Sequence, residues 1–242
     1  MQKYIYFYER KHKKLNSICF IILIKYTEIS INFVMDMVMD NLNIAISIGN
    51  DCSVAYNIRK LNYANVAFPF DWMKLQNLKS VIEIIKNDFA GFCDLDQYEI
   101  LPQYTNFAYN DQEDELIDVV NITEIPSITS RCKLVHKKYG FILPHEFNGD
   151  YLDKEKFIEK YNRRIARFRK YVKDSRYEVR FIRLGIFKDK NYIDELTEIL
   201  ENYCKHDNFV IYNINESLYE LPKTENFIWT REYIPWDKIL AL

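Results

Sequence analysis

The sequence predicts an α/β fold, with a single domain built on a mostly parallel sheet that carries helices on both faces. Two observations support this. Segments typical of strands and helices alternate from residue 153 to residue 212, and strand–helix–strand units normally make right-handed crossovers between parallel strands. The chain has 242 residues, of which 48% are hydrophobic, so it can bury a substantial core in one domain.

The first expected strand and helix meet at a glycine turn. Residues 43–48 (Asn-Ile-Ala-Ile-Ser-Ile) form an apolar, β-branched run, which is typical of a buried strand. Gly49 ends the run, and residues 52–59 have helical character. Asn50 or Asp51 can cap this helix because a side-chain oxygen there accepts a hydrogen bond from the first turn.

Further elements follow with signals of different strength. Residues 78–89 carry apolar side chains at helical spacing, whereas residues 94–130 are irregular and predict loops and short strands. Residues 153–172 give the strongest helical pattern, and the apolar side chains predicted on one face are Phe157, Ile158, Tyr161, Ile165 and Phe168. The remaining predicted elements are strands at 139–143, 178–184, 208–212 and 227–230, and a helix at 192–203.

The first 42 residues differ from the rest of the chain. A basic stretch precedes an apolar run at residues 18–24, which is far shorter than the roughly 20 residues that span a bilayer. We interpret residues 1–42 as an N-terminal extension that the domain at 43–242 does not need. The alternative is an additional strand and helix packed on the domain.

Composition excludes several classes of protein. Lys+Arg 33 against Asp+Glu 35 gives a net charge of −2, so no basic excess points to nucleic acid, and no segment predicts a membrane span. The five glycines lack the spacing of a dinucleotide fingerprint or a P-loop. The five cysteines are scattered and never form C-x-x-C, which favours a reducing, cytoplasmic environment without a structural metal. We expect no cofactor, and the sequence does not define the oligomeric state.

Cys52 is the first candidate for chemistry. It lies at the strand-to-helix junction Gly49-Asn50-Asp51-Cys52, and unpaired N–H groups at a helix N-terminus favour a thiolate and can stabilise an oxyanion. Asp51 opposes the thiolate unless its carboxylate turns away into a cap. The alternatives are a small residue packed at a tight turn, or a serine nucleophile at Ser53 or Ser47.

His145 is the favoured base for this thiol. It directly follows a predicted strand, and ligands of open α/β sheets bind beyond the carboxyl ends of the strands. Of the other histidines, His136 and His206 lie in polar stretches that predict a surface location, and His12 lies in the extension. A structural histidine bonded to the backbone is the alternative for His145. The side chains that could orient the imidazole are Asp71, Glu146, Asn148 and Asp150.

The turn Pro69-Phe70-Asp71-Trp72 and two arginines complete the candidate site. Asp71 is the favoured orienter, and we assign Asn50, Trp72, Arg164 and Arg183 to substrate binding. Arg183 lies in an apolar strand, where a buried guanidinium needs a carboxylate partner such as Asp71 or Glu146. A second function from another class is a non-catalytic protein whose aromatic and arginine-lined cleft binds an acidic or glycan ligand.

Several motifs together resemble one family. They are Ile46-Ser47-Ile48-Gly49-Asn50-Asp51-Cys52, Pro69-Phe70-Asp71-Trp72, His145-Glu146-Phe147, Tyr161-Asn162-Arg163-Arg164-Ile165 and Phe181-Ile182-Arg183-Leu184. In order and spacing, residues 43–239 resemble the domain-of-unknown-function family described as putative papain-like cysteine peptidases of bacteria and large DNA viruses. The resemblance implies a thiol hydrolase acting on a peptide or small acyl substrate, with Cys52 as nucleophile and His145 as base, and a papain-like α+β fold as the alternative architecture.

Overall fold

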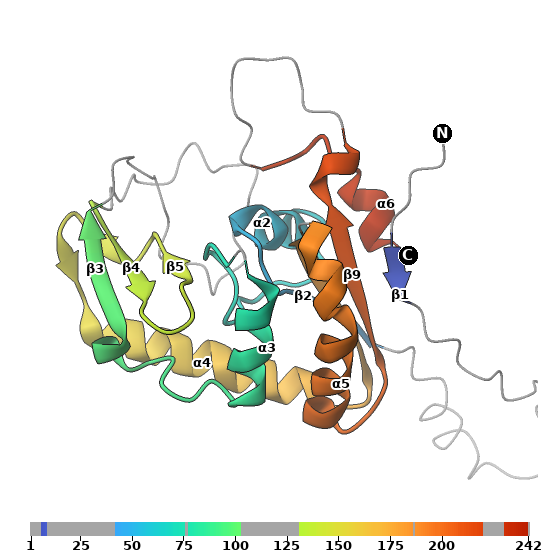
Figure 1. Cartoon of the computed structure of the whole chain (residues 1–242), viewed down its shortest axis with the longest axis horizontal. Coiled ribbons are helices and arrows are strands. Elements are labelled where there is room, and N and C mark those ends of the chain that lie inside the picture. The colour runs from blue at the N-terminus through green and yellow to red at the C-terminus, as the bar shows by residue number, and fades with distance from the viewer. Residues whose placement is uncertain are drawn as a thin grey trace, which may run out of the picture.

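Three of the four described strands of the main sheet are parallel. The computed structural model describes residues 6–8, 42–75, 77–102, 131–185, 187–219 and 230–241. Strands β2 (Leu42–Ser47), β8 (Tyr177–Gly185) and β9 (Phe209–Asn215) are parallel, and the sheet order is β1-β9-β8-β2. The short strand β1 (Tyr6–Tyr8) pairs antiparallel with β9 at one edge (Figure 1).

Helices cover both faces of this sheet. Successive side chains of a strand point to opposite faces, and in β8 the ring of Phe181 contacts Phe168 of α4 (Lys154–Val172), whereas Arg180 donates to the carbonyl of Leu240 at 2.6 Å. Leu240 belongs to α6 (Trp236–Leu240), so α4 and α6 lie on opposite faces. Helix α3 (Leu78–Lys86) packs against α5 (Ile193–Cys204) in front of β9 in Figure 1.

The long helix α4 carries the predicted apolar face, with two corrections. Phe157, Tyr161, Ile165 and Phe168 are buried as expected, but Ile158 is 40% exposed. Arg164 is fully buried instead, because its guanidinium lies 5.1 Å from the ring of Tyr161 and donates to the carbonyl of Asp71 at 3.5 Å. Arg164, which the sequence analysis assigned to substrate binding, is therefore enclosed in the interior.

Two small antiparallel sheets lie beside the parallel one. The first contains β3 (Tyr98–Pro102), β4 (Cys132–His136) and β5 (Ile142–Leu143), and the second contains β6 (Phe147–Asn148) and β7 (Tyr151–Leu152). The predicted strand at 139–143 is therefore only its last two residues. The α/β prediction holds in outline, but among the described residues the parallel pairing is limited to β2, β8 and β9.

Strand β4 was not predicted, and it places His136 in the interior. His136 is only 2% exposed and lies among the rings of Tyr98, Tyr139 and Phe141. Its Nδ1 accepts from the amides of Lys138 and Tyr139. The expectation of a surface histidine is wrong because the residues around it are aromatic in space although they are basic in sequence.

The remaining elements are short. They are helix α2 (Cys52–Lys60) and single 3₁₀ turns at Leu95–Gln97, Phe187–Tyr192 and Glu216–Leu218. Residues 103–130 and most of the strand predicted at 227–230 lie outside the described residues, and Thr230 is in a turn. Strand β1 shows that part of the N-terminal extension pairs with the domain. None of the helices in the described ranges combines the length and apolar character that a bilayer crossing requires.

Candidate active site

The turn after β2 places Cys52 at the first position of α2. Asp51 is the N-cap residue, and its Oδ1 accepts hydrogen bonds from the Ser53 amide at 3.0 Å and the Ser53 hydroxyl at 2.7 Å. Gly49 has φ of +96°, and a Cβ there would come within 2.8 Å of an Arg183 nitrogen. Only glycine adopts this backbone conformation without strain. A larger residue would also collide with the Arg183 guanidinium.

Arg183 supports the turn after β2 from the protein interior. It is fully buried, its Nε donates to the Asp189 carboxylate at 2.8 Å, and its Nη1 donates to the carbonyls of Ile48 at 3.0 Å and Leu75 at 3.2 Å. The predicted carboxylate partner therefore exists, but it is Asp189 rather than Asp71 or Glu146. The guanidinium is enclosed by protein groups, which makes Arg183 a support of the turn.

Residues 74–75, which we call the strap, connect the region that carries His145 to the turn that carries Cys52. The amide of Leu75 donates to the Asn50 carbonyl at 2.7 Å, and Lys74 exchanges two backbone hydrogen bonds of 2.9 Å with Ile142. Ile142 begins β5, and His145 follows that strand closely in the chain. The histidine therefore lies in the turn after β5, and residues 74–75 connect the antiparallel sheet to the turn that carries Cys52.

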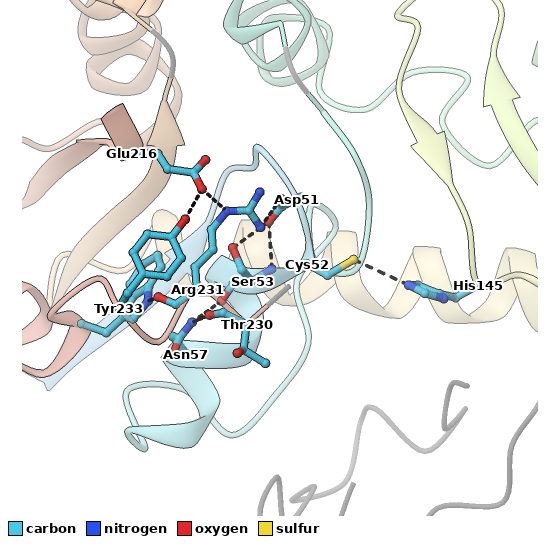
Figure 2. A network of polar contacts seen from close by, with 10 residues as sticks. Asp51, Cys52, Ser53, Asn57, His145, Glu216, Thr230, Arg231 and Tyr233 are labelled. Atoms are coloured by element: carbon cyan, nitrogen blue, oxygen red, sulfur yellow. Dashed lines mark hydrogen bonds and ion pairs between the residues drawn. The ribbon is translucent and has the colours of Figure 1, made fainter. Parts of the chain in front are cut away.

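The thiol and the imidazole meet directly. Cys52 Sγ lies 3.6 Å from His145 Nε2, which is within hydrogen-bonding distance for sulfur, and both side chains are half-buried. Figure 2 shows the sulfur directed to the imidazole and the Asp51 carboxylate directed the other way. Ser53 and Ser47 are buried, and the Ser53 hydroxyl is bound to Asp51, so neither competes as a nucleophile.

Both groups of the pair are held neutral. Burial, followed by the charge of Asp51, raises the pKa of the Cys52 thiol from 9.0 to about 12. Burial and the nearby Lys160 and Lys74 lower the pKa of His145 from 6.5 to about 3. The backbone at the helix N-terminus lowers the thiol pKa as expected, but desolvation disfavours each charged form and outweighs this effect.

Asp71 lies in a different set of contacts from the one predicted. Its buried Oδ2 accepts from Arg59 at 3.1 Å and from the Phe68 amide at 2.9 Å, and burial raises its pKa. Among the described residues, His145 is not a partner of this carboxylate. Asp71 therefore fixes the aromatic turn instead of orienting the imidazole.

The residues assigned to substrate binding are spread over different environments. Arg164 and Arg183 are both fully buried. Trp72 is half-buried with Arg59 stacked 5.0 Å from its ring, and Asn50 is half-buried at the turn beside Cys52. A binding role for Asn50 and Trp72 stays a prediction.

A pocket that the sequence did not reveal opens beside His145. Its volume is about 360 Å³, and its walls come from β6, β7 and the first turns of α4. Glu146 pairs with Lys160 at 2.8 Å and accepts from Tyr161 at 2.9 Å next to the histidine. Other residues that line the pocket are Asn148, Tyr151, Lys156 and Arg163. Nothing in the sequence relates these residues to one another, because the hairpin and the helix meet only in the fold.

A second feature missed by the sequence is an ion-pair network behind the turn. Arg231 Nη1 lies 2.7 Å from Asp51 Oδ2, and Arg231 Nε lies 2.8 Å from Glu216 Oε1. Tyr233 donates to the same carboxylate (Figure 2). Within the described residues, no cluster of three or more histidine, cysteine or acidic side chains is placed to hold a metal ion.

Comparisons with known proteins identify one family and one curated relative. The model of the family described as "Putative papain-like cysteine peptidase (DUF1796)" matches residues 43–215. A curated relative, "Uncharacterized protein R408" of Acanthamoeba polyphaga mimivirus, is 28% identical over 232 residues, covering 84% of this chain and 99% of that protein. No solved structure matches the chain.

Proposed function

The chain belongs to the family described as "Putative papain-like cysteine peptidase", and we propose that it is a thiol-dependent hydrolase that cleaves an amide or ester bond with Cys52 and His145. The observation that carries the proposal is the 3.6 Å contact between Cys52 Sγ and His145 Nε2. A general base must lie within hydrogen-bonding distance of the proton it removes. A non-catalytic binding protein needs no such contact.

The neutral pair defines how the first step proceeds. As the sulfur attacks the substrate carbonyl, the thiol proton passes to His145 Nε2, and negative charge moves to the carbonyl oxygen. The amide of Cys52 lies at the start of α2, where N–H groups have no partner within the helix. This amide is placed to stabilise the oxyanion.

The later steps return the site to its starting state. His145 gives the proton to the leaving amine or alcohol, the carbonyl re-forms, and a thioester remains on Cys52. Water then attacks the thioester while His145 accepts its proton, and the carboxylic acid leaves as the thiol is restored. His145 also lines the pocket of about 360 Å³, and we assign this pocket to the leaving group.

A pair of probes tests the proposal. A peptidyl ketone that presents a carbonyl-like electrophile should label the wild-type protein at neutral pH, because His145 can take the proton during attack. Iodoacetamide lacks this assistance and should react slowly at the same pH, since the thiol pKa is about 12. Cys52→Ala should abolish the ketone labelling, and His145→Gln should reduce it by about 100-fold or more.

Cys93→Ala is the matched control. Cys93 is also a half-buried free thiol, but its Sγ lies 3.4 Å from an oxygen of Asn162 rather than beside an imidazole. This variant should be labelled like the wild type. Labelling of Cys93 or Cys204 at the rate of Cys52 would contradict the proposal, as would undiminished labelling of a folded His145→Gln variant.

A further inference from the structure

The structure assigns a positioning role to Arg231: we infer that its guanidinium holds the Asp51 carboxylate in the cap of α2, turned away from Cys52 Sγ, and offsets its charge beside the nucleophile. This inference rests on the proposed function, because it concerns the readiness of the same thiol. It extends the site beyond the residues matched by the family, since that match ends at residue 215.

Asp51 is in a position that can either hinder or support the nucleophile. It precedes Cys52 directly, and its charge opposes ionisation of the thiol. Its two oxygens are divided between two tasks: Oδ1 caps the helix through Ser53, and Oδ2 binds Arg231 at 2.7 Å. Figure 2 shows that both tasks draw the carboxylate to the side opposite the sulfur.

Arg231 is fixed from several directions. Its side chain is largely buried, its Nε binds Glu216 at 2.8 Å, and its carbonyl accepts from the Trp236 indole at 2.9 Å. The preceding Thr230 carbonyl accepts from Asn57 of α2 at 2.7 Å. Burial lowers the pKa of Arg231, but Asp51 and Glu216 outweigh burial and leave it above its ordinary value. A cation held this firmly restrains Asp51 as well as neutralising it.

Other charged groups also act on Cys52. Lys74, from the strap, favours the thiolate, and Asp71, from the aromatic turn, opposes it more weakly than Asp51 does. His145 faces the sulfur from the loop after β5. Tyr233 and Glu216 face Arg231 rather than the thiol. Asp51 is therefore the largest opposing charge, and Arg231 is its cationic partner.

The test measures alkylation of Cys52 in the full chain with iodoacetamide from pH 7.5 to 10, quantified on the peptide that contains Cys52. Arg231→Gln should slow the reaction about tenfold at pH 8, because one unmatched carboxylate near a thiol shifts its ionisation by about one pKa unit in partly screened surroundings. Arg231→Lys keeps the positive charge but loses the separate nitrogens through which the guanidinium binds Asp51 and Glu216. This variant should slow the alkylation about threefold.

Glu232→Gln is the matched control. Glu232 is the next residue, but its carboxylate pairs with Lys60 and Tyr56 of α2 rather than with Asp51. Cys52 should therefore be alkylated in the Glu232→Gln variant at the wild-type rate. In an Asp51→Asn background, Arg231→Gln should change the rate by less than about twofold, because the charge that Arg231 offsets is gone. Thermal unfolding establishes that each variant is folded, and Arg231→Lys decides the test if Arg231→Gln is not.

Two results would overturn the inference: an alkylation rate in Arg231→Gln and Arg231→Lys equal to that of Glu232→Gln, or an equal loss with and without Asp51. The readout does not depend on hydrolysis. If the ketone probe does not label Cys52 while Arg231→Gln still slows its alkylation, the hydrolase proposal fails and the role of Arg231 stands. The reverse pattern removes only the role of Arg231.

Discussion

Replacing Arg183 should damage the fold and the site together. Arg183 and Asp189 form a buried ion pair, with side-chain exposures of 0% and 3%. Removing one partner of such a pair leaves an uncompensated charge and costs about 3–5 kcal/mol. The carbonyls of Ile48 and Leu75 lose a donor as well. We therefore expect Arg183→Met to lower the free energy of unfolding by about 4 kcal/mol, which corresponds to roughly 8–16 °C in Tm for a chain of this size.

Urea unfolding followed by circular dichroism provides the measurement. Arg183→Met/Asp189→Leu is the informative comparison, because removing both charges should recover much of the loss. Ketone labelling of Cys52 should fall in the single variant, since the turn after β2 loses its support. A loss below about 1 kcal/mol in Arg183→Met would refute the reasoning, because a guanidinium that binds substrate can be removed without the cost of an orphaned buried carboxylate.

Two further predictions concern acid stability and the N-terminal extension. Burial lowers the pKa of His136 from 6.5 to about 4, so the unfolded chain binds a proton first as the pH falls. The stability associated with neutral His136 is complete above pH 6.5 and should decline by about 2–3 kcal/mol by pH 4.5; urea unfolding at pH 7 and pH 4.5 should show a flatter decline in His136→Gln, and an equal decline would contradict this. Deleting residues 1–34 removes β1 but should leave soluble protein with a similar Tm, and loss of soluble expression would show that the extension is part of the fold.

Local signals explain what the sequence could predict. The apolar run of β2, the cap at Asp51 and the apolar spacing of α4 are each contained within one element, and the structure has all three. Strand β4 has no such signal, because Cys-Lys-Leu-Val-His includes a basic residue and runs into further lysines. Its neighbours in space are aromatic rings from other parts of the chain.

The site shows the same division. Cys52 and His145 were predicted from their positions at element ends, and they meet at 3.6 Å. The predicted route was one shared sheet edge, whereas the observed route runs through Lys74 and Ile142 between two sheets. Asp51 and Arg231 are 180 residues apart in the sequence although they are in contact, and no spacing rule relates such residues. The partner of Arg183 was missed for a different reason: Asp189 follows closely in sequence, but only the 3₁₀ turn after β8 folds it back.

The competition between helix and burial at Cys52 decides the chemical state of the nucleophile. A helix N-terminus stabilises a nearby negative charge by about 0.3–1 kcal/mol, and by about 2 kcal/mol in favourable geometry. The rise in thiol pKa from 9.0 to about 12 corresponds to roughly 4 kcal/mol in the opposite direction. Burial therefore prevails, and the resting thiol keeps its proton. Under the proposed function, reactivity then comes from transfer of that proton to His145 when a carbonyl enters, so the proposal depends on the position of the imidazole rather than on a standing thiolate.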